Sequence, residues 1–470
     1  MTDRPYIIPL TYRDPIEAFA AFAFDSTSIF LDSAAQSEGR GRYAYIAVDP
    51  YKIITAENSY DPFAKLEDNL KSICILKDHR LPPFQGGAIG FFSYELSRHL
   101  EQLPKPKKGL GTSDMMVGLF DTVVAFDTWK RRAWVIAQDV VVDLKKSKTI
   151  SPNFPRNRHP KAERAELIAS RYYEAPPGGS LDWTSVGHWK PDLSRAEYEK
   201  MVKRVIDYIH AGDIFQANIT QRLLAKLPTD LSPFMLYRRL RFLSPAPFGA
   251  YLSFEKTAIL SASPERFLHL DHEGLVMTRP IKGTRPRGFN KKHDEVLARE
   301  LIDSEKDYAE NLMIVDLLRN DLSRVCRLGS VAVTELANLE SFSNVHHLVS
   351  EIRGTLFPNL GPIDLLRATF PGGSITGAPK IRAMEIISQL EPVCRGPYCG
   401  VIAWIGFDGA MDSSIVIRTL VVEGDQVAAQ AGGGIVADSV PVDEFNETMD
   451  KAWPLIQSLD PGDIVRKQMR

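Results

Sequence analysis

Three glutamates in the second half of the chain could hold a hard divalent cation. Glu444 and Glu447 are three residues apart in Asp443–Thr448, so a helix would place both carboxylates on one face. Glu310 lies in Asp307–Asp316, whose pattern predicts a helix with a buried apolar side. Carboxylates that leave room for water and a substrate carboxylate suit Mg2+, and the chain offers few Cys and His ligands for Zn2+. For Glu444 and Glu447 alone, a solvated helix surface is the alternative.

Three further residues are candidates for covalent or proton-transfer catalysis. Lys282 stands between a predicted strand and a charged stretch, and as a nucleophile it needs a pKa lowered by burial or by a nearby cation. Glu265 could act as a general acid or base. Of the adjacent His346 and His347, one should face away from any site. Without further evidence, the default interpretation of Lys282 is an ordinary exposed lysine.

Two glycine-rich segments could bring backbone N–H groups to an anion. Pro371–Lys380 is a small-residue loop, for which a tight turn before a helix is the alternative. A nucleotide-binding Walker A loop is excluded, because Ala378 and Pro379 stand where its lysine and hydroxyl residue should follow. Ala431–Ile435 ends a predicted strand, with Arg418 on the neighbouring strand as a bidentate carboxylate partner. Two anion sites suggest a dicarboxylate ligand.

The elements that must position these residues mix helices and strands without a regular βαβ rhythm. Helices are predicted over about 62–72, 162–171, 195–211 and 304–318, and strands over about 119–126, 133–137, 250–254, 258–260, 415–422 and 426–431. Ser194 and Glu197 have the spacing of a capping box at the start of the third helix. The pattern favours an α+β fold over a Rossmann or barrel repeat.

Composition narrows the class of partner. The chain has 57 Lys and Arg against 59 Asp and Glu, so its overall charge would not attract nucleic acid. It shows neither a signal-like apolar region at its start nor a run long enough to span a membrane, so the cytoplasm is the expected location. Four cysteines are too few for a disulfide framework and lack zinc-site spacing. A linker is expected between Lys145 and Gly179.

Seven segments, taken in order, resemble motifs of the chorismate-utilising enzymes, a family that includes anthranilate, aminodeoxychorismate, isochorismate and salicylate synthases. They are Ser263–Phe267, Pro280–Thr284, Ala309–Met313, His347–Ser350, Gly377–Lys380, Ile417–Leu420 and Gly434–Ser439. Upstream, Gly86–Glu95 resembles the N-terminal domain of the same family. The resemblance covers nearly the whole chain, and chance does not place seven motifs in one order.

Within the family, Lys282 favours the aminodeoxychorismate synthase large subunit. That subfamily has the pattern Pro-Ile-Lys-Gly-Thr, as in Pro280–Thr284, whereas anthranilate synthases carry alanine in place of the lysine. The resemblance implies conversion of chorismate and ammonia to 4-amino-4-deoxychorismate, for para-aminobenzoate and folate synthesis. Anthranilate synthase component I is the alternative enzyme. A non-catalytic chorismate-binding regulator is the alternative from another class, and it should lack Glu265 or the metal carboxylates, which are all present.

The resemblance also implies roles for individual residues. Lys282 would add to the substrate ring, Glu265 would move protons, and His347 would line the pocket. Glu310, Glu444 and Glu447 would hold Mg2+. The substrate-binding residues would be Arg418, Tyr398, Thr376, Lys451, Gly432, Gly433 and Gly434.

The implied fold has two α+β subdomains with orthogonally packed sheets flanked by helices, over residues 1–180 and 185–465, the second carrying the active site. Some family members hold tryptophan between the subdomains, and the segments around Ser33, Pro245 and Ala246 resemble its contacts. Because these segments depart from the feedback-regulated pattern, a structural ligand or an empty pocket is expected there. No cysteine has the Gly-x-Cys-x-Gly setting of a glutaminase, so a separate glutamine amidotransferase subunit is expected to supply ammonia.

Overall fold

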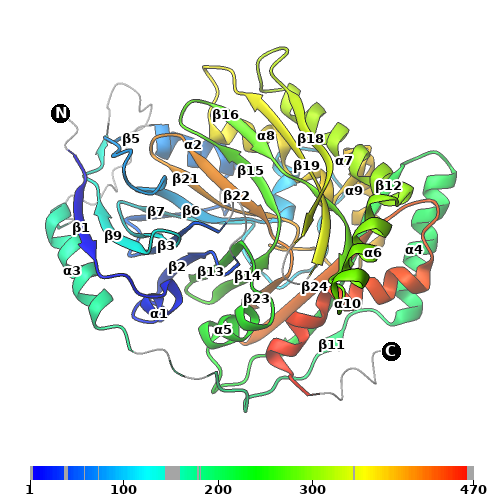
Figure 1. Cartoon of the computed structure of the whole chain (residues 1–470), viewed down its shortest axis with the longest axis horizontal. Coiled ribbons are helices and arrows are strands. Elements are labelled where there is room, and N and C mark those ends of the chain that lie inside the picture. The colour runs from blue at the N-terminus through cyan, green and yellow to red at the C-terminus, as the bar shows by residue number, and fades with distance from the viewer. Residues whose placement is uncertain are drawn as a thin grey trace.

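The computed structural model describes residues 4–35, 41–57, 59–71, 73–142, 159–176, 179, 181–341 and 345–462. Its strands form two large antiparallel sheets (Figure 1). The expected linker between Lys145 and Gly179 lies largely outside the described residues, apart from a helix, α3 (Lys161–Tyr173). The α+β class is confirmed.

The first sheet has 12 strands in the described part of the chain. In spatial order they are β1 (Tyr6–Leu10), β9 (Arg132–Ala137), β8 (Thr122–Asp127), β3 (Tyr43–Val48), β2 (Thr27–Asp32), β13 (Phe248–Phe254), β14 (Thr257–Ser263), β23 (Thr419–Glu423), β24 (Gln426–Ile435), β12 (Gln216–Lys226) and β11 (Lys190–Pro191), with β20 (Gly377–Ala378) also pairing with β12.

The second sheet has 10 strands within the described ranges. They are β17 (Ile281–Pro286), β19 (Val345–Thr355), β16 (Leu275–Thr278), β15 (Arg266–Leu270), β22 (Met411–Ile415), β21 (Val401–Gly406), β6 (Gly87–Phe92), β7 (Met115–Phe120) and β4 (Lys52–Thr55), with β18 (Ala332–Ser341) also pairing with β19. A separate short ribbon joins β5 (Ile73–Cys74) to β10 (Val141–Val142).

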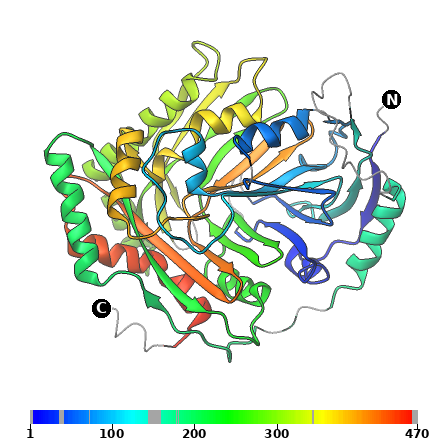
Figure 2. The ribbon, with the colours of Figure 1, turned by 180° about the vertical axis from the view of Figure 1, so that it is seen from behind.

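Helices cover the outer faces of both sheets, as the front and back views show (Figures 1 and 2). On the first sheet lie α1 (Pro15–Phe19), α3, α5 (Pro233–Leu243) and α10 (Pro441–Leu459); on the second lie α2 (Pro62–Lys71), α7 (Glu305–Ser323) and α8 (Pro362–Thr369). A third apolar core, including Tyr45 and Phe91, fills the space between the sheets. Burial in three such layers is the main stabilising contribution.

Two further helices pack beside β12, near the end of the first sheet. They are α4 (Arg195–His210) and α9 (Lys380–Leu390), which share a core with Ile219. The predicted capping box at α4 is confirmed: the Ser194 hydroxyl accepts from Glu197 N, and the Glu197 carboxylate accepts from Ser194 N. Such a cap stabilises a helix by about 1 kcal/mol.

Two expected strands are each divided, and both divisions pass the chain from one sheet to the other. The run 119–126 is split at Asp121, where β7 of the second sheet ends and β8 of the first begins. The run 415–422 is split between β22 and β23. Arg418 therefore lies in a connection, with φ +53°, and not on a strand beside β24 as predicted. The sequence does not reveal these crossings, because strands buried on both faces read as one continuous apolar run.

The division of the chain into two subdomains, residues 1–180 and 185–465, stays a prediction. Strands from both segments join the same sheets: β2 pairs with β13, and β6 pairs with β21. Residue 180 itself lies outside the described residues. In the described part of the chain, no helix is long and apolar enough to cross a membrane.

Candidate functional site

Lys282 and Glu310 form an ion pair where β17 meets α7. Lys282 Nζ lies 2.8 Å from Glu310 Oε1. Burial works against the charge on this lysine, but Glu310 outweighs it, so the pKa of Lys282 is raised. The pKa of Glu310 is lowered, because Lys282 outweighs the effect of its burial. Lys282 is therefore a largely buried, paired ammonium and not the exposed lysine of the default interpretation, and its role as a nucleophile, which needs a lowered pKa, stays a prediction.

Gly283 fixes the position of Lys282 on β17. The pairing of β17 with β19 shifts register between Lys282 and Thr284, which makes Gly283 a bulge with φ +72°. A Cβ at this glycine would lie 2.9 Å from Leu301 Cδ1 and 3.1 Å from Asp307 Cβ. The glycine of the Pro-Ile-Lys-Gly-Thr segment is therefore required by backbone conformation and by close packing of the helices.

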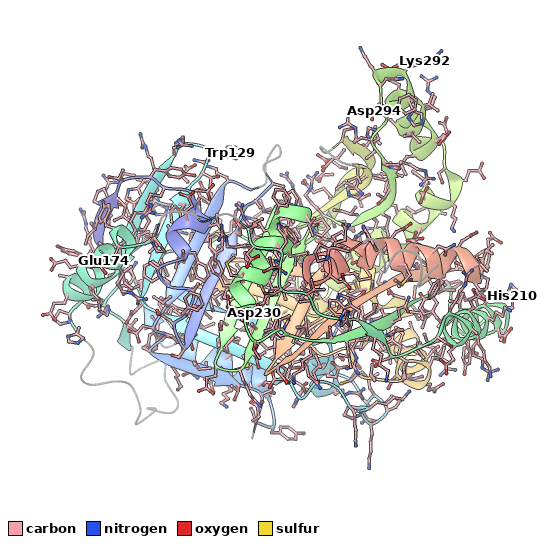
Figure 3. All side chains as sticks on the ribbon, turned by 90° about the horizontal axis from the view of Figure 1, so that it is seen from below. Trp129, Glu174, His210, Asp230, Lys292 and Asp294 are labelled. Atoms are coloured by element: carbon pink, nitrogen blue, oxygen red, sulfur yellow. The ribbon has the colours of Figure 1, made fainter. Side chains whose placement is uncertain are left out.

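The two adjacent histidines of β19 separate as expected. His346 Nε2 lies 3.0 Å from Asp294 Oδ1 of α6 (Lys291–Ile302), a helix that stands out from the body of the molecule (Figure 3). His347 Nδ1 lies 2.9 Å from Thr284 Oγ1, on the strand that carries Lys282. His346 therefore anchors α6, and His347 is the histidine beside the predicted nucleophile; its role stays a prediction.

Glu265 is a buried carboxyl that lies near both Lys282 and the glycine-rich loop. The Ser374 hydroxyl donates a 2.8 Å hydrogen bond to Glu265 Oε1. Burial raises the pKa of Glu265 to about 7, although Ser374 and Lys282 both lower it. A carboxyl with this pKa can both give and accept a proton near neutral pH.

The glycines of β24 leave room for three carboxylates. A Cβ at Gly434 would lie 3.0 Å from Glu310 Oε1, and a Cβ at Gly433 would lie 3.1 Å from Glu444 Oε2 and 3.9 Å from Glu447 Oε1. Glu447 also lies close enough to Glu310 for the charge of Glu310 to act to raise the pKa of Glu447.

The glycines of β24 lie beyond the end of its pairing with β23. Pairing of β23 with β24 stops at Ala429, which leaves the following glycines without a partner strand on that side. Oxygen donors around such a side-chain-free strand fit a hard cation. Among the residues that the structure describes, however, no three acidic, His or Cys side chains are grouped as metal ligands.

Each of these carboxylates has a protein partner instead. Glu310 pairs with Lys282, Glu444 Oε1 accepts from the Ser439 hydroxyl at 2.7 Å, and Glu447 Oε1 lies 2.6 Å from Lys451 Nζ. Burial raises the pKa of Glu444, whereas the Lys451 ion pair outweighs burial and lowers the pKa of Glu447. The Mg2+ site stays a prediction that the donor chemistry supports.

Arg418 is a guanidinium with spare donors. Within the described residues it makes one hydrogen bond, from Nη1 to the Lys451 carbonyl at 3.0 Å, and no ion pair. Burial lowers its pKa, while Tyr398 and Glu447 act to raise it. A partly buried guanidinium without a carboxylate within ion-pair distance in the described residues is well suited to an anionic ligand. Tyr398 is itself buried beside it, at 4% exposure.

The Thr376 hydroxyl already makes hydrogen bonds within its own loop. Its predicted role in binding substrate stays a prediction. The hydroxyl donates to the carbonyls of Gly372 and Gly373 and closes the loop on itself. Lys380 likewise serves structure, since its Nζ lies 2.6 Å from Asp321 Oδ2 in a buried ion pair. Lys451, by contrast, reaches the glycine strand: its Nζ donates to the Gly432 carbonyl at 3.0 Å.

Sequence reasoning missed the polar residues that hold the site together. Arg395, 2% exposed, pairs with Glu391 and donates to the carbonyls of Ile375 and Asn218. Gln216 donates from Nε2 to Glu310 Oε1 at 2.9 Å. The alternation of Gln216 and Asn218 along β12 places both on one face, and this signal could have marked them.

A cavity of about 390 Å³ lies between the sheets, apart from these residues. Ser33 lines it, as predicted for the tryptophan contacts, whereas Pro245 and Ala246 do not; the neighbouring Pro247 and Phe248 do. Ala246 is buried, and its carbonyl accepts from Ala35 N. Whether tryptophan occupies this cavity stays a prediction.

Comparison with solved structures confirms the expected fold type. Anthranilate synthase component I from Streptococcus pneumoniae matches with a TM-score of 0.74 at 33% sequence identity, over 87% of this chain and 91% of that chain. Its architecture is therefore that of this chain.

Two curated relatives match at equal identity. The chain is 41% identical over 475 residues to aminodeoxychorismate synthase component 1 of Klebsiella aerogenes, which covers 97% of this chain and 99% of the relative. It is also 41% identical over 462 residues to anthranilate synthase component 1 of Thermus thermophilus, which covers 95% of each. The sequence pattern of the family described as chorismate binding enzyme matches residues 27–457. The chain therefore belongs to the chorismate binding enzymes.

Proposed function

We propose that the chain is the large subunit of an aminodeoxychorismate synthase, which replaces the 4-hydroxyl of chorismate with an amino group. The observation that carries the proposal is the placement of Lys282. Its amine is buried, bonded to Glu310 and close enough to Glu265 to lower the pKa of that carboxyl. A lysine and a proton donor thus lie near one another, as covalent displacement needs.

In the first half-reaction, the Lys282 ammonium gives one proton to water and the neutral amine adds to ring carbon 2. Both ring double bonds shift, the bond from carbon 4 to its hydroxyl breaks, and Glu265 donates the proton that lets water leave. In the second, ammonia adds to carbon 4, both double bonds shift back, and the lysine leaves as a neutral amine. The Glu265 carboxylate then takes one proton from the new ammonium group, and the released amine takes one from water, so that the enzyme returns to its starting state.

Glu310 must release Lys282 before the lysine can act as a nucleophile. Glu310, Glu444 and Glu447 are the residues that would hold Mg2+, and Glu310 now accepts a hydrogen bond from Lys282. When bound, the cation would supply positive charge for the ring carboxylate of the substrate. Arg418 would hold the second carboxylate, and the glycines of β24 would let the ring approach the backbone.

Anthranilate synthase is the second candidate, because a relative of that name is as similar as the aminodeoxychorismate synthase of Klebsiella aerogenes. That reaction also removes the pyruvyl group of chorismate. Lys282 argues against it, since the anthranilate synthase pattern has alanine at this position. Retention of Glu265 and the metal carboxylates argues against a regulator without activity.

Ammonia would come from a separate amidotransferase subunit, and the pair would work in the cytoplasm. Burial raises the pKa of Cys326 and Cys394 to about 11 and that of Cys399 to about 12. A thiol with so high a pKa is a poor nucleophile. The cysteine side chains that the structure describes are therefore unsuited to glutamine hydrolysis.

Lys282→Ala should abolish covalent capture of the substrate and lower amination by at least about 100-fold, because the nucleophile is gone. Without ammonium, wild type incubated with chorismate should gain the mass of chorismate less one water in intact-mass analysis, and the variant should not. Lys292→Ala, at an exposed lysine of α6, is the control. Amination by Lys282→Ala at the wild-type rate would make the lysine a bystander.

Glu265→Gln should change how stability depends on pH as well as removing activity. The folded-state pKa of about 7 lies above the unfolded value of about 4.3, so wild type has a stability contribution at pH 4 that is lost as pH rises through 7. Glutamine does not titrate. In calorimetry, the free energy of unfolding of the variant, relative to that of wild type, should increase by on the order of 2 kcal/mol between pH 4.5 and 8. If the stabilities of variant and wild type depended on pH in the same way, the raised pKa of Glu265 would be contradicted. Glu300→Gln, at an exposed glutamate, is the control.

Single changes of Glu310, Glu444 and Glu447 to glutamine should each raise the Mg2+ concentration for half-maximal turnover, by about 10-fold or more, because each removes a charged oxygen ligand. Asp443→Asn, at an exposed position of α10, should leave it unchanged. Chelation with EDTA should stop turnover of wild type. Full activity in EDTA would overturn the metal assignment for all three residues.

The purified chain should use ammonium salts and not glutamine. Its rate at fixed total ammonium should rise with pH, since more of the nucleophile is then neutral NH3. Addition of an amidotransferase subunit should confer glutamine use. Glutamine-dependent turnover by the verified pure chain would contradict the partner assignment.

A further inference from the structure

Strand β12 presents two carboxamides to the predicted reaction space. Gln216 and Asn218 are two residues apart, so their side chains lie on the same face. Asn218 pairs across the sheet with Gly434, the glycine against which Glu310 lies. The mechanism proposed above uses neither of them.

Gln216 is 2% exposed and is held beside the catalytic lysine. Its Nε2 donates to Glu310 Oε1, the same oxygen that accepts from Lys282 Nζ. Its carbonyl oxygen, Oε1, is buried and has no hydrogen-bond partner among the described residues. This side chain therefore ends in a buried acceptor next to the nucleophile.

Asn218 is linked through Ser374 to Glu265, the proposed proton donor. Its Nδ2 lies 3.5 Å from the Ser374 carbonyl, and the Ser374 hydroxyl bonds Glu265. Its Oδ1 is also buried without a hydrogen-bond partner in the described part of the chain. The two free oxygens thus belong to side chains that contact Glu310 of the Lys282–Glu310 pair and Ser374 of the Ser374–Glu265 pair.

A buried carbonyl oxygen left without a hydrogen bond is unfavourable, and two on one face require an explanation. Both need N–H or O–H donors. The nearby carboxylates of Glu310 and Glu265 disfavour an anion there, so the missing group is a small neutral or cationic donor with at least two hydrogens. The absence of a side chain at Gly434 keeps this space open.

We propose that Gln216 Oε1 and Asn218 Oδ1 bind the ammonia that attacks the substrate. The inference rests on the proposed function and extends it to the second substrate. Ammonia has three N–H donors and one lone pair: two hydrogens would bond the two oxygens, and the lone pair would be left for ring carbon 4. After the carbon–nitrogen bond forms and the lysine leaves, one proton passes from the new ammonium group to the Glu265 carboxylate.

Asn218→Leu tests this assignment, because it keeps the volume and removes the acceptor. The variant should raise the KM for ammonium chloride by about 10-fold or more, as loss of one such hydrogen bond implies, with the KM for chorismate unchanged. Capture of chorismate by Lys282 without ammonium should proceed at the wild-type rate. Asn218→Asp keeps an acceptor and should stay within about threefold of the wild-type KM for ammonium.

Gln221→Leu is the matched control. Gln221 is a buried carboxamide of the same strand, on the opposite face, whose Nε2 lies 3.6 Å from Met449 Sδ. It should leave the KM for ammonium unchanged. If Asn218→Leu does not fold, Asn218→Ala takes its place in the same comparison.

The outcomes separate this inference from the proposed function. An unchanged KM for ammonium in Asn218→Leu would mean that the oxygens bind only water, and would overturn the ammonia site. Slower covalent capture in that variant would equally overturn it, because Asn218 would then act through the first half-reaction. Failure of wild type to form the adduct or the amino product would instead overturn the proposed function itself.

Discussion

The buried ion pair between Arg395 and Glu391 is the interaction on which the geometry of the site depends. Arg395 donates to the Ile375 carbonyl of the glycine-rich loop and to the Asn218 carbonyl of β12. Glu391 accepts from both the backbone N–H and the hydroxyl of Thr220 on the same strand. Removing one partner of such a pair costs roughly 3–5 kcal/mol, because the other charge stays buried. Through it the loop that carries the Glu265 partner is fixed against the strand that carries the carboxamides.

Charge balance explains why the site suits a cation together with a dicarboxylate. Lys282, Arg418 and Lys451 lie among the carboxylates of Glu265, Glu310, Glu444 and Glu447, and the Glu265 pKa of about 7 leaves that group partly neutral. A divalent cation and a dianionic substrate entering together would leave the net charge unchanged. Either one alone would leave uncompensated charge in a partly buried space, which is unfavourable.

Much of the local structure could be predicted from the sequence, since capping residues and amphipathic periods act over a few residues. The α4 capping box and the α7 helix that carries Glu310 are examples. The crossings at Asp121 and near Arg418 could not be predicted, because strands buried on both faces lose their alternation. The candidate site residues could be predicted only through the resemblance to a known family. The Lys282–Glu310 pair and the partners of Arg395 depend on contacts between residues far apart in the sequence, which no local pattern encodes.

The most direct test of the account is the identity of the product. The purified chain, given chorismate, Mg2+ and an ammonium salt labelled with 15N, should release a compound that mass spectrometry shows to retain the pyruvyl side chain and to carry one labelled amino group in place of the 4-hydroxyl. Release of pyruvate together with fluorescent, labelled anthranilate would contradict it and assign the chain to the other branch of the family.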